Sequence, residues 1–181
     1  MKHAGTAADS RALLRPVLIG LGGVAALTAS SYIAVPMYPV PVTLQTLVVL
    51  LLGAVMGPRA GAATVLAWLA LSLTGAPVLA EGKSGLVAFA GPTAGYLASF
   101  PVVAFLAGYL PKDDRIASHV SRFAGFLGLH AAILFAGWSW LSAWMGIDGA
   151  FVAGVVPFLI GSVLKSGLAT ALVAAFPRKA G

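Results

Sequence analysis

The apolar run at residues 151–176 reads FVAGVVPFLIGSVLKSGLATALVAAF. A helix needs about 20 predominantly apolar residues to cross the hydrocarbon core of a bilayer, and this run is longer than that. Lys165 is its only charged residue, and it lies inside the run rather than at an end. The run therefore predicts a membrane-spanning helix that holds one cation at depth.

The rest of the chain has the same apolar character. Of its 181 residues, 60% are hydrophobic and only 9% are charged, whereas about 25% are charged in an ordinary soluble domain. Gly and Pro divide the chain into six apolar segments, which we expect to be helices at about residues 16–35, 43–56, 59–73, 92–110, 123–145 and 151–176. The sequence thus predicts an all-α membrane protein in which residues 1–181 form a single membrane domain with six transmembrane helices.

The positively charged residues predict which side of the membrane each loop faces, because Lys and Arg in short loops stay in the cytoplasm. With the N-terminus inside, Lys83 alone falls outside. The cytoplasmic set is Lys2, Arg11, Arg15, Arg59, Lys112, Arg115, Arg122, Arg178 and Lys179. We therefore expect both termini, including a tail at residues 1–14, to be cytoplasmic. Basic residues scattered in this way do not form the basic face that nucleic-acid binding needs.

The first apolar segment has a basic tail before it, as a signal peptide has. It is longer than the about 7–15 apolar residues of a signal sequence, so we expect it to remain. Ala25 and Ala29 place small residues four positions apart on one helix face, which lets helices approach closely in lipid, either inside this bundle or against another membrane protein. Gly53, Gly57 and Gly61 have the same spacing, and we expect these to be structural because Gly57 lies in a predicted turn.

Lys165 is the first candidate for a ligand contact, because ionisable side chains inside a span are costly and commonly functional. In a helix that begins at Pro157, Lys165 lies about 12 Å along the axis, and Ser162 shares its face. No Asp or Glu falls at membrane depth in any segment. Either Lys165 bonds only to carbonyls, hydroxyls or water, or a ligand supplies the carboxylate or carbonyl that meets it.

Polar residues at the start of two predicted helices are further candidates. Gln45 offers a donor and an acceptor near the outer face, next to Thr43, whose alternative role is that of an N-cap. Thr93 follows Pro92 at a helix start, where free N–H groups favour anionic or carbonyl groups. Tyr96 is either a ligand contact or a residue of the interfacial aromatic belt.

The connection at residues 75–91 is too long for a simple turn and too apolar for a solvated loop. Loops of this length in compact domains are commonly functional, so we expect an extracellular lid that carries Glu81 and Lys83. Trp68, in the middle of the segment before it, either stacks on a bound ring or packs in the core.

Several kinds of chemistry are excluded by the composition. The chain has no Cys, which removes disulfides, thiolate catalysis and Cys-bound zinc. The histidines His3, His119 and His130 have no metal-ligand spacing, and we expect His130 to be a hydrogen-bonded core residue. There is no Gly-rich phosphate loop and no repeated acidic lining of an ion channel. No metal, cofactor or enzymatic activity is expected, which leaves a small membrane receptor for a compact organic ligand.

Five motifs, in this order and spacing, resemble those of the BioY family. They are PVPVTLQT at residues 39–46, GPR at 57–59, GAPV at 75–78, GPTAGY at 91–96 and PFLIGSVLK at 157–165. BioY proteins are the substrate-binding S-components of biotin transporters of the energy-coupling factor (ECF) class. The resemblance covers about residues 25–169 and implies a six-helix S-component fold.

The resemblance also implies a function and partners. The protein would bind biotin from outside the bacterial inner membrane, and a transmembrane coupling subunit with two ATPase subunits would drive import. Ala25 and Ala29 match the small-residue face through which related S-components contact the coupling subunit. A homo-oligomer is left open. The alternatives are an S-component for another small vitamin-like ligand and a membrane assembly partner that does not transport.

The residues implied to contact biotin are Gln45, Trp68, Lys83, Phe89, Thr93, Tyr96, Ser162 and Lys165. Gln45, Ser162 and Lys165 are expected at the ureido ring, and the aromatic residues at the apolar parts of biotin. Lys83 or the helix-start amides near Thr93 would meet the carboxylate, and which end of biotin faces Lys165 is left open. The family commonly has Asp at the position of Ser162, so only a hydroxyl is available there.

Overall fold

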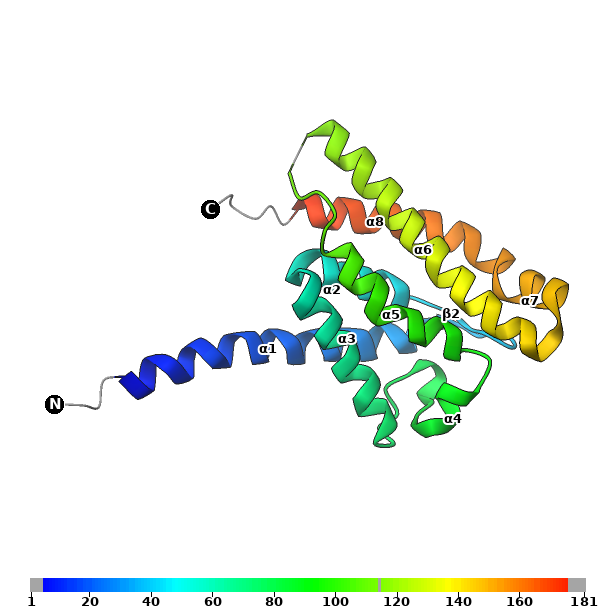
Figure 1. The fold of residues 1–181 in the computed structure, drawn as a ribbon, viewed down its shortest axis with the longest axis horizontal. Coiled ribbons are helices and arrows are strands. Elements are labelled where there is room, and N and C mark those ends of the chain that lie inside the picture. The colour runs from blue at the N-terminus through cyan, green and yellow to red at the C-terminus, as the bar shows by residue number, and fades with distance from the viewer. Residues whose placement is uncertain (1–4, 114, 176–181) are drawn as a thin grey trace.

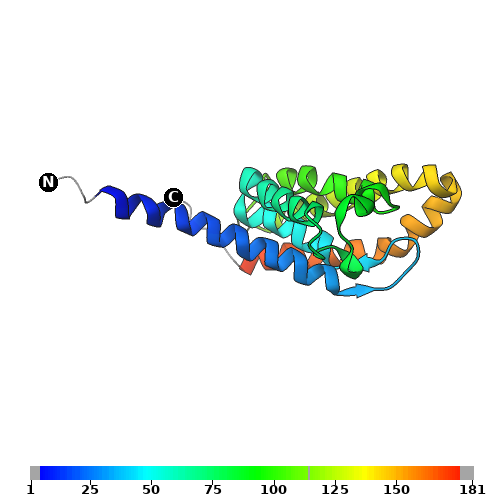
Figure 2. The same ribbon diagram turned by 90° about the horizontal axis from the view of Figure 1, so that it is seen from below.

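The computed structural model describes residues 5–113 and 115–175, with side chains from Leu14 onward (Figure 1). The helices are α1 (Gly5–Tyr32), α2 (Gln45–Met56), α3 (Pro58–Leu73), α4 (Gly85–Ala90), α5 (Ala94–Ala107), α6 (Ile116–Met145), α7 (Ile147–Gly154) and α8 (Leu159–Ala175). Two 3₁₀ helices, η1 (Ala80–Gly82) and η2 (Val156–Phe158), and the short strands β1 (Ala34–Val35) and β2 (Val42–Thr43) complete the described fold. Figure 2 shows that α1 runs along one side of the bundle and extends beyond it.

Three stretches of the described chain are long and apolar enough to cross a membrane, namely Leu14–Tyr32, Ile116–Met145 and Ile147–Ala175. Helices α2, α3 and α5 are also apolar, but they have 12, 16 and 14 residues, fewer than the about 20 of a typical span. These units correspond one to one with the six predicted segments. The predicted all-α membrane architecture is therefore confirmed.

The predicted limits of the N-terminal helix need correction. Helix α1 begins at Gly5, inside the predicted tail, and ends at Tyr32 rather than at residue 35. It ends there because the next residues pair as an antiparallel ladder, Ala34 with Thr43 and Val35 with Val42. The Pro-rich residues 36–41 are thus the loop of a hairpin whose second strand leads directly into α2.

The last two predicted segments also differ from the structure. Helix α6 begins at Ile116 rather than at residue 123. The predicted helix at residues 151–176 is broken after Gly154, and its last residue lies outside the described part. Pro157 lies in η2, so the helix that carries Lys165 begins at Leu159, which places Lys165 about 9 Å along it instead of 12 Å.

Arg122 does not lie in the loop where the charge count put it. It is in α6 with 0% of its surface exposed. Its guanidinium donates to the backbone carbonyls of Pro111 and Asp113, both at 2.8 Å, and of Thr170 at 3.3 Å. Arg122 therefore ties α6 to the preceding loop and to α8.

Three of the other described cations, Arg59, Lys112 and Lys83, separate between the two ends of the bundle. Arg59, in the first turn of α3, and Lys112 lie at the end where α8 finishes, whereas the hairpin and Lys83 lie at the opposite end (Figure 1). Lys2, Arg178 and Lys179 lie outside the described residues, and so does the side chain of Arg11. This separation agrees with the charge distribution that predicted the orientation.

Close backbone packing joins α2 to its neighbours α3 and α5. A Cβ atom on Gly53 would lie 1.9 Å from the backbone oxygen of Ala104, and one on Gly61 would lie 2.6 Å from Cα of Gly53. Gly57 has a φ of +91° in the turn between α2 and α3. The structural role predicted for these three glycines is confirmed, because each position excludes or strains a larger residue.

We expect Gly53→Ala to lower the free energy of unfolding by about 1–3 kcal/mol, the usual cost of inserting a methyl group into a packed interior. The matched control is Gly128→Ala in α6, where an added Cβ meets nothing within 4 Å. That variant should be neutral or more stable by up to about 1 kcal/mol, since Ala favours a helix. Thermal unfolding in detergent compares the two, and equal midpoints would contradict the packing argument.

Candidate ligand-binding site

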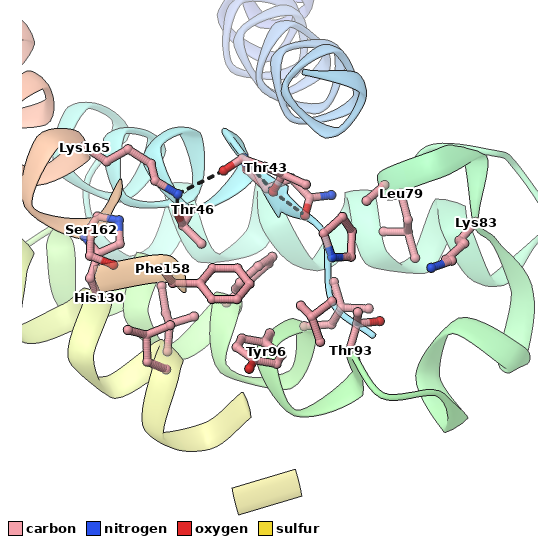
Figure 3. A pocket seen from close by; sticks show the side chains of 18 of the residues that line it. Thr43, Thr46, Leu79, Lys83, Thr93, Tyr96, His130, Phe158, Ser162 and Lys165 are labelled. Carbon is pink, nitrogen blue, oxygen red and sulfur yellow. Dashed lines mark hydrogen bonds between the residues drawn. The ribbon is translucent and has the colours of Figure 1, made fainter. Parts of the chain in front are cut away.

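A cavity opens among α2, α5, α6, η2, α8 and the lid, and it holds about 680 Å³ of empty space including its mouth. Only about 50 Å³ of it admits the centre of a water-sized sphere, which is well below the about 300–1,000 Å³ of typical small-molecule sites, so the cavity is narrow. Figure 3 shows Lys165, Ser162 and His130 at one end, Lys83 at the other, and Tyr96 and Phe158 between them. In the described part of the chain, no Asp or Glu lines the cavity.

The structure brings most of the predicted ligand residues together. Those that line the cavity are Gln45, Lys83, Thr93, Tyr96, Ser162 and Lys165. They come from α2, the lid, α5 and α8, which are far apart in the sequence. As contacts to a ligand they stay predictions, but their convergence on one cavity is a property of the fold.

Trp68 and Phe89 do not line the cavity, so their predicted place in its walls is corrected. Trp68 is fully buried and stacks behind Phe100, with 6.5 Å between the ring centroids. Phe89 is half-buried and packs against the hydrophobic core. The aromatic lining comes instead from Phe100 and Phe158, together with Tyr96.

Lys165 reaches across the cavity from α8 to the start of α2. Its side chain is buried, and Nζ donates to the carbonyl oxygen of Thr43 and to Oγ1 of Thr46, both at 2.9 Å (Figure 3). An ammonium group has three donors, so these two bonds leave one for a ligand. Lys165 therefore makes the bonds to a carbonyl and a hydroxyl that we expected of a buried cation. Its third N–H remains available at the cavity wall.

Gln45 links the cavity to α1. Its Nε2 donates to Oγ of Ser31 at 2.7 Å, and its Oε1 accepts from Oγ1 of Thr43 at 3.2 Å. The Thr43 hydroxyl also accepts from the backbone N–H of Gln45 at 3.3 Å. Thr43 thus supports the first turn of α2 from β2, although the N-cap position itself is Leu44, and the predicted N-cap is corrected.

Tyr96 is a buried wall residue, so its interpretation as an interfacial belt residue is wrong. Its hydroxyl donates to the carbonyl oxygen of Gly154 at 2.7 Å, where α7 ends. Its ring stacks with Phe158 at 6.0 Å between centroids. The ring fits because Gly137 faces it, and a Cβ there would lie 2.1 Å from the ring. Tyr96 offers a ligand its ring, because its hydroxyl proton is already donated.

The predicted lid is partly helical, since it contains η1 and α4. Leu79 lines the cavity, and the hydroxyl of Tyr32 in α1 donates to the carbonyl oxygen of Pro77 at the base of the lid. Lys83 is paired with Glu81, 2.7 Å from Nζ to Oε2, and both side chains are exposed. A cation therefore lies at the mouth of the cavity, paired with an exposed carboxylate.

His130 lines the cavity as well, which the sequence reasoning did not predict. Its expected place as a hydrogen-bonded core residue is confirmed, because Nδ1 lies 3.1 Å from the carbonyl oxygen of Phe126 and 3.0 Å from Oγ of Ser166. Nε2 is buried without a partner. The sequence could not predict that His130 lines the cavity, because residue spacing within one helix does not show which residues of a neighbouring helix lie beside it. Among the residues with described positions, no cluster of three metal-ligating side chains is found.

The comparisons with known proteins agree with this geometry. The family model described as "BioY family" matches residues 2–181. The chain belongs to the BioY family. Among curated BioY proteins, the "Probable biotin transporter BioY" of Pyrococcus horikoshii is 36% identical over 152 residues, which cover 84% of this chain and 88% of the relative. The "Biotin transporter BioY" of Rhizobium etli is 39% identical over 145 residues, 74% of this chain and 76% of the relative.

A solved structure confirms the fold. A crystal structure described as the S-component for biotin from an ECF-type ABC transporter superposes with a TM-score of 0.81. The alignment covers 94% of this chain and 95% of that chain, at 24% sequence identity. The chain therefore has the S-component fold that the motifs predicted.

Proposed function

We propose that this BioY-family protein binds biotin in the cavity and delivers it to an energy-coupling module for import. The names of its relatives support the ligand, and the cavity supports it chemically. Biotin has a polar ureido ring at one end, a carboxylate at the other and apolar groups between them. The cavity has Lys165 and Ser162 at one end, Lys83 at the other and aromatic walls between them, and this correspondence carries the proposal.

The orientation of biotin follows from the cost of burying charge. A carboxylate loses far more hydration on burial than a neutral urea does. Lys83 lies on the exposed lid, whereas Lys165 is buried. We therefore infer that the carboxylate stays at the mouth near Lys83, and that the ureido ring points inward to Lys165, Ser162 and the wall near Gln45.

The proposed membrane arrangement has six spans, in one domain of residues 1–181, with both termini on the cytoplasmic side of the bacterial inner membrane. The grouping of Arg59 and Lys112 at one end of the bundle and Lys83 at the other supports it, because Lys and Arg in short loops stay in the cytoplasm. The cavity then opens outward under an extracellular lid. Because the family is one of transport proteins, no enzymatic step is assigned.

The proposed partners are a transmembrane coupling subunit and two ATPase subunits. Ala25 and Ala29 are exposed on α1, so they do not pack inside this bundle. Gly22 is on the same side of the helix, and an added Cβ there would meet nothing within 4 Å. An open face of small residues supports close approach by a helix of another membrane protein.

Binding of radiolabelled biotin to the purified protein tests the proposed function. We expect saturable binding that unlabelled biotin displaces and that other small vitamins do not. Absence of saturable binding, with a protein that still shows a cooperative thermal transition, would contradict it. If a different vitamin displaces the labelled biotin, the alternative holds, namely that the protein is an S-component for another small vitamin-like ligand.

We expect Lys83→Met to weaken biotin binding by up to about fivefold, since an exposed ion pair contributes at most about 1 kcal/mol. The methyl ester of biotin, which has no carboxylate, should bind wild type and variant equally. Glu81→Gln is the opposing control, because it removes the carboxylate that competes for Lys83, and it should bind biotin at least as tightly as wild type. If Lys83→Met weakens the binding of biotin and of its methyl ester equally, the carboxylate of biotin does not lie at Lys83.

A further inference from the structure

His130 is held in one orientation by its own helix and by α8. Nδ1 lies 3.1 Å from the carbonyl oxygen of Phe126, and a carbonyl oxygen only accepts hydrogen bonds. When Nδ1 donates to this oxygen it carries the proton, and its other neighbour, Oγ of Ser166 at 3.0 Å, can accept from it as well. In the neutral ring Nε2 is then an acceptor, and it belongs to the edge of the ring farther from the α6 backbone.

This acceptor has no partner in the described protein. The side chain of His130 is 2% exposed, and Nε2 makes no hydrogen bond. Leaving a buried polar atom unpaired costs about 1–3 kcal/mol. The ring lines the cavity beside Ser162 and Lys165 (Figure 3), so a ligand whose donor reaches Nε2 would remove this cost.

Lys165 cannot take the place of this acceptor, because an ammonium group only donates. The Ser162 hydroxyl has one proton and two lone pairs, so it can either donate or accept. Among the described residues, no carboxylate lines the cavity. A ligand head with both N–H and C=O groups would find its donors on Lys165 and its acceptor on His130.

We propose that His130 is a ligand-contacting residue whose Nε2 accepts a hydrogen bond from an N–H of the ligand's ureido ring. The inference rests on the proposed function, since it takes biotin as the ligand. It assigns the inner end of the cavity to a cyclic urea or amide that carries an N–H, and it makes His130 a determinant of specificity against ligands without one.

Two substitutions separate contact with the ligand from support of the helix. In His130→Asn the amide nitrogen replaces Nδ1 and keeps the bond to Phe126, but nothing replaces Nε2. In His130→Gln the amide oxygen reaches the place of Nε2, and the support at Nδ1 is lost. We expect Asn to raise the Kd for biotin about ten- to a hundredfold, and Gln to raise it less than about fivefold.

The measurement is biotin affinity by calorimetry, with thermal unfolding of each variant as the check on folding. The reverse order, with Gln weaker than Asn, would show that His130 only supports α6 and α8 and would overturn the inference. Wild-type affinity in His130→Asn would overturn it too. If the wild-type protein itself binds no biotin, the proposed function fails instead, so the two failures are distinguishable.

Modified ligands test the same contact without altering the protein. Biotin methylated on one ureido nitrogen lacks that N–H, and two such isomers exist. We expect one isomer to bind wild type at least about tenfold more weakly than biotin. His130→Asn, which has no acceptor at Nε2 and more room, should lose this discrimination. If wild type binds both isomers as tightly as biotin, no ureido N–H is recognised and the inference is wrong.

Discussion

Lys165→Met is expected to weaken biotin binding more than about a hundredfold while the protein stays folded. Lys165 bonds to the carbonyl of Thr43 and the hydroxyl of Thr46 and keeps a third donor at the cavity wall. A hydrogen bond from a charged group contributes about 1.5–3 kcal/mol, and the unpaired ligand carbonyl adds about 1–3 kcal/mol. Since about 1.4 kcal/mol is a tenfold change in affinity, the sum of about 2.5–6 kcal/mol corresponds to about two to four orders of magnitude.

Folding should survive this substitution, because removing a buried charge that has no counter-ion also removes its desolvation cost, which offsets the loss of the bonds to Thr43 and Thr46. The matched control is Leu164→Met, next in the chain on α8, where the side chain is 67% exposed. It should bind biotin as wild type does. Equilibrium binding on both proteins in the same detergent is the measurement. Unchanged affinity in Lys165→Met would remove Lys165 from the site.

The polar residues of the cavity were predictable because polarity is rare in this chain. Lys165 stood out as a charge far from any span end, and Ser162 followed from helix spacing. The same argument failed for His130, whose neighbours Ser166 and Lys165 come from another helix. A sequence shows which residues need partners in a membrane, but not which helices supply them.

Aromatic residues were harder to assign, because a ring at a lipid interface, in the core or on a ligand has the same hydropathy. Trp68 stacks against Phe100, and the ring of Phe100 lies between it and the cavity. Tyr96 reaches the cavity only because Gly137 leaves room for it. Both outcomes depend on packing between helices, which the period of a single helix does not encode.

Helix limits differed where the backbone changes but the hydropathy does not. The break between Gly154 and Leu159 lies inside an apolar run, so composition predicts one helix. Arg122 shows the opposite error: a charge marked the end of a segment, but carbonyls from the preceding loop and from α8 satisfy it inside the bundle. Charge counting assumes that a cation stays in water, and that assumption fails when several carbonyls replace the water.

A double variant, Ala25→Trp with Ala29→Trp, is expected to abolish biotin uptake and to leave biotin binding unchanged. Both alanines are exposed on α1 and neither lines the cavity. In lipid, helices associate through close backbone approach, and two bulky rings on the contact face would prevent it. Overpacking costs about 1–3 kcal/mol per site, so uptake should fall by at least about tenfold, to the level of cells without the protein.

The comparison needs a bulky residue placed where no docking is proposed. Ile160→Trp in α8 serves, because Ile160 is 75% exposed and lies on a different helix. It should change neither uptake nor binding. Uptake is measured in cells that supply the coupling subunits, and Kd on the purified proteins. Wild-type uptake in the double variant would remove the α1 face from coupling. Loss of binding together with uptake would instead assign Ala25 and Ala29 to the support of the cavity, through the bond between Ser31 and Gln45.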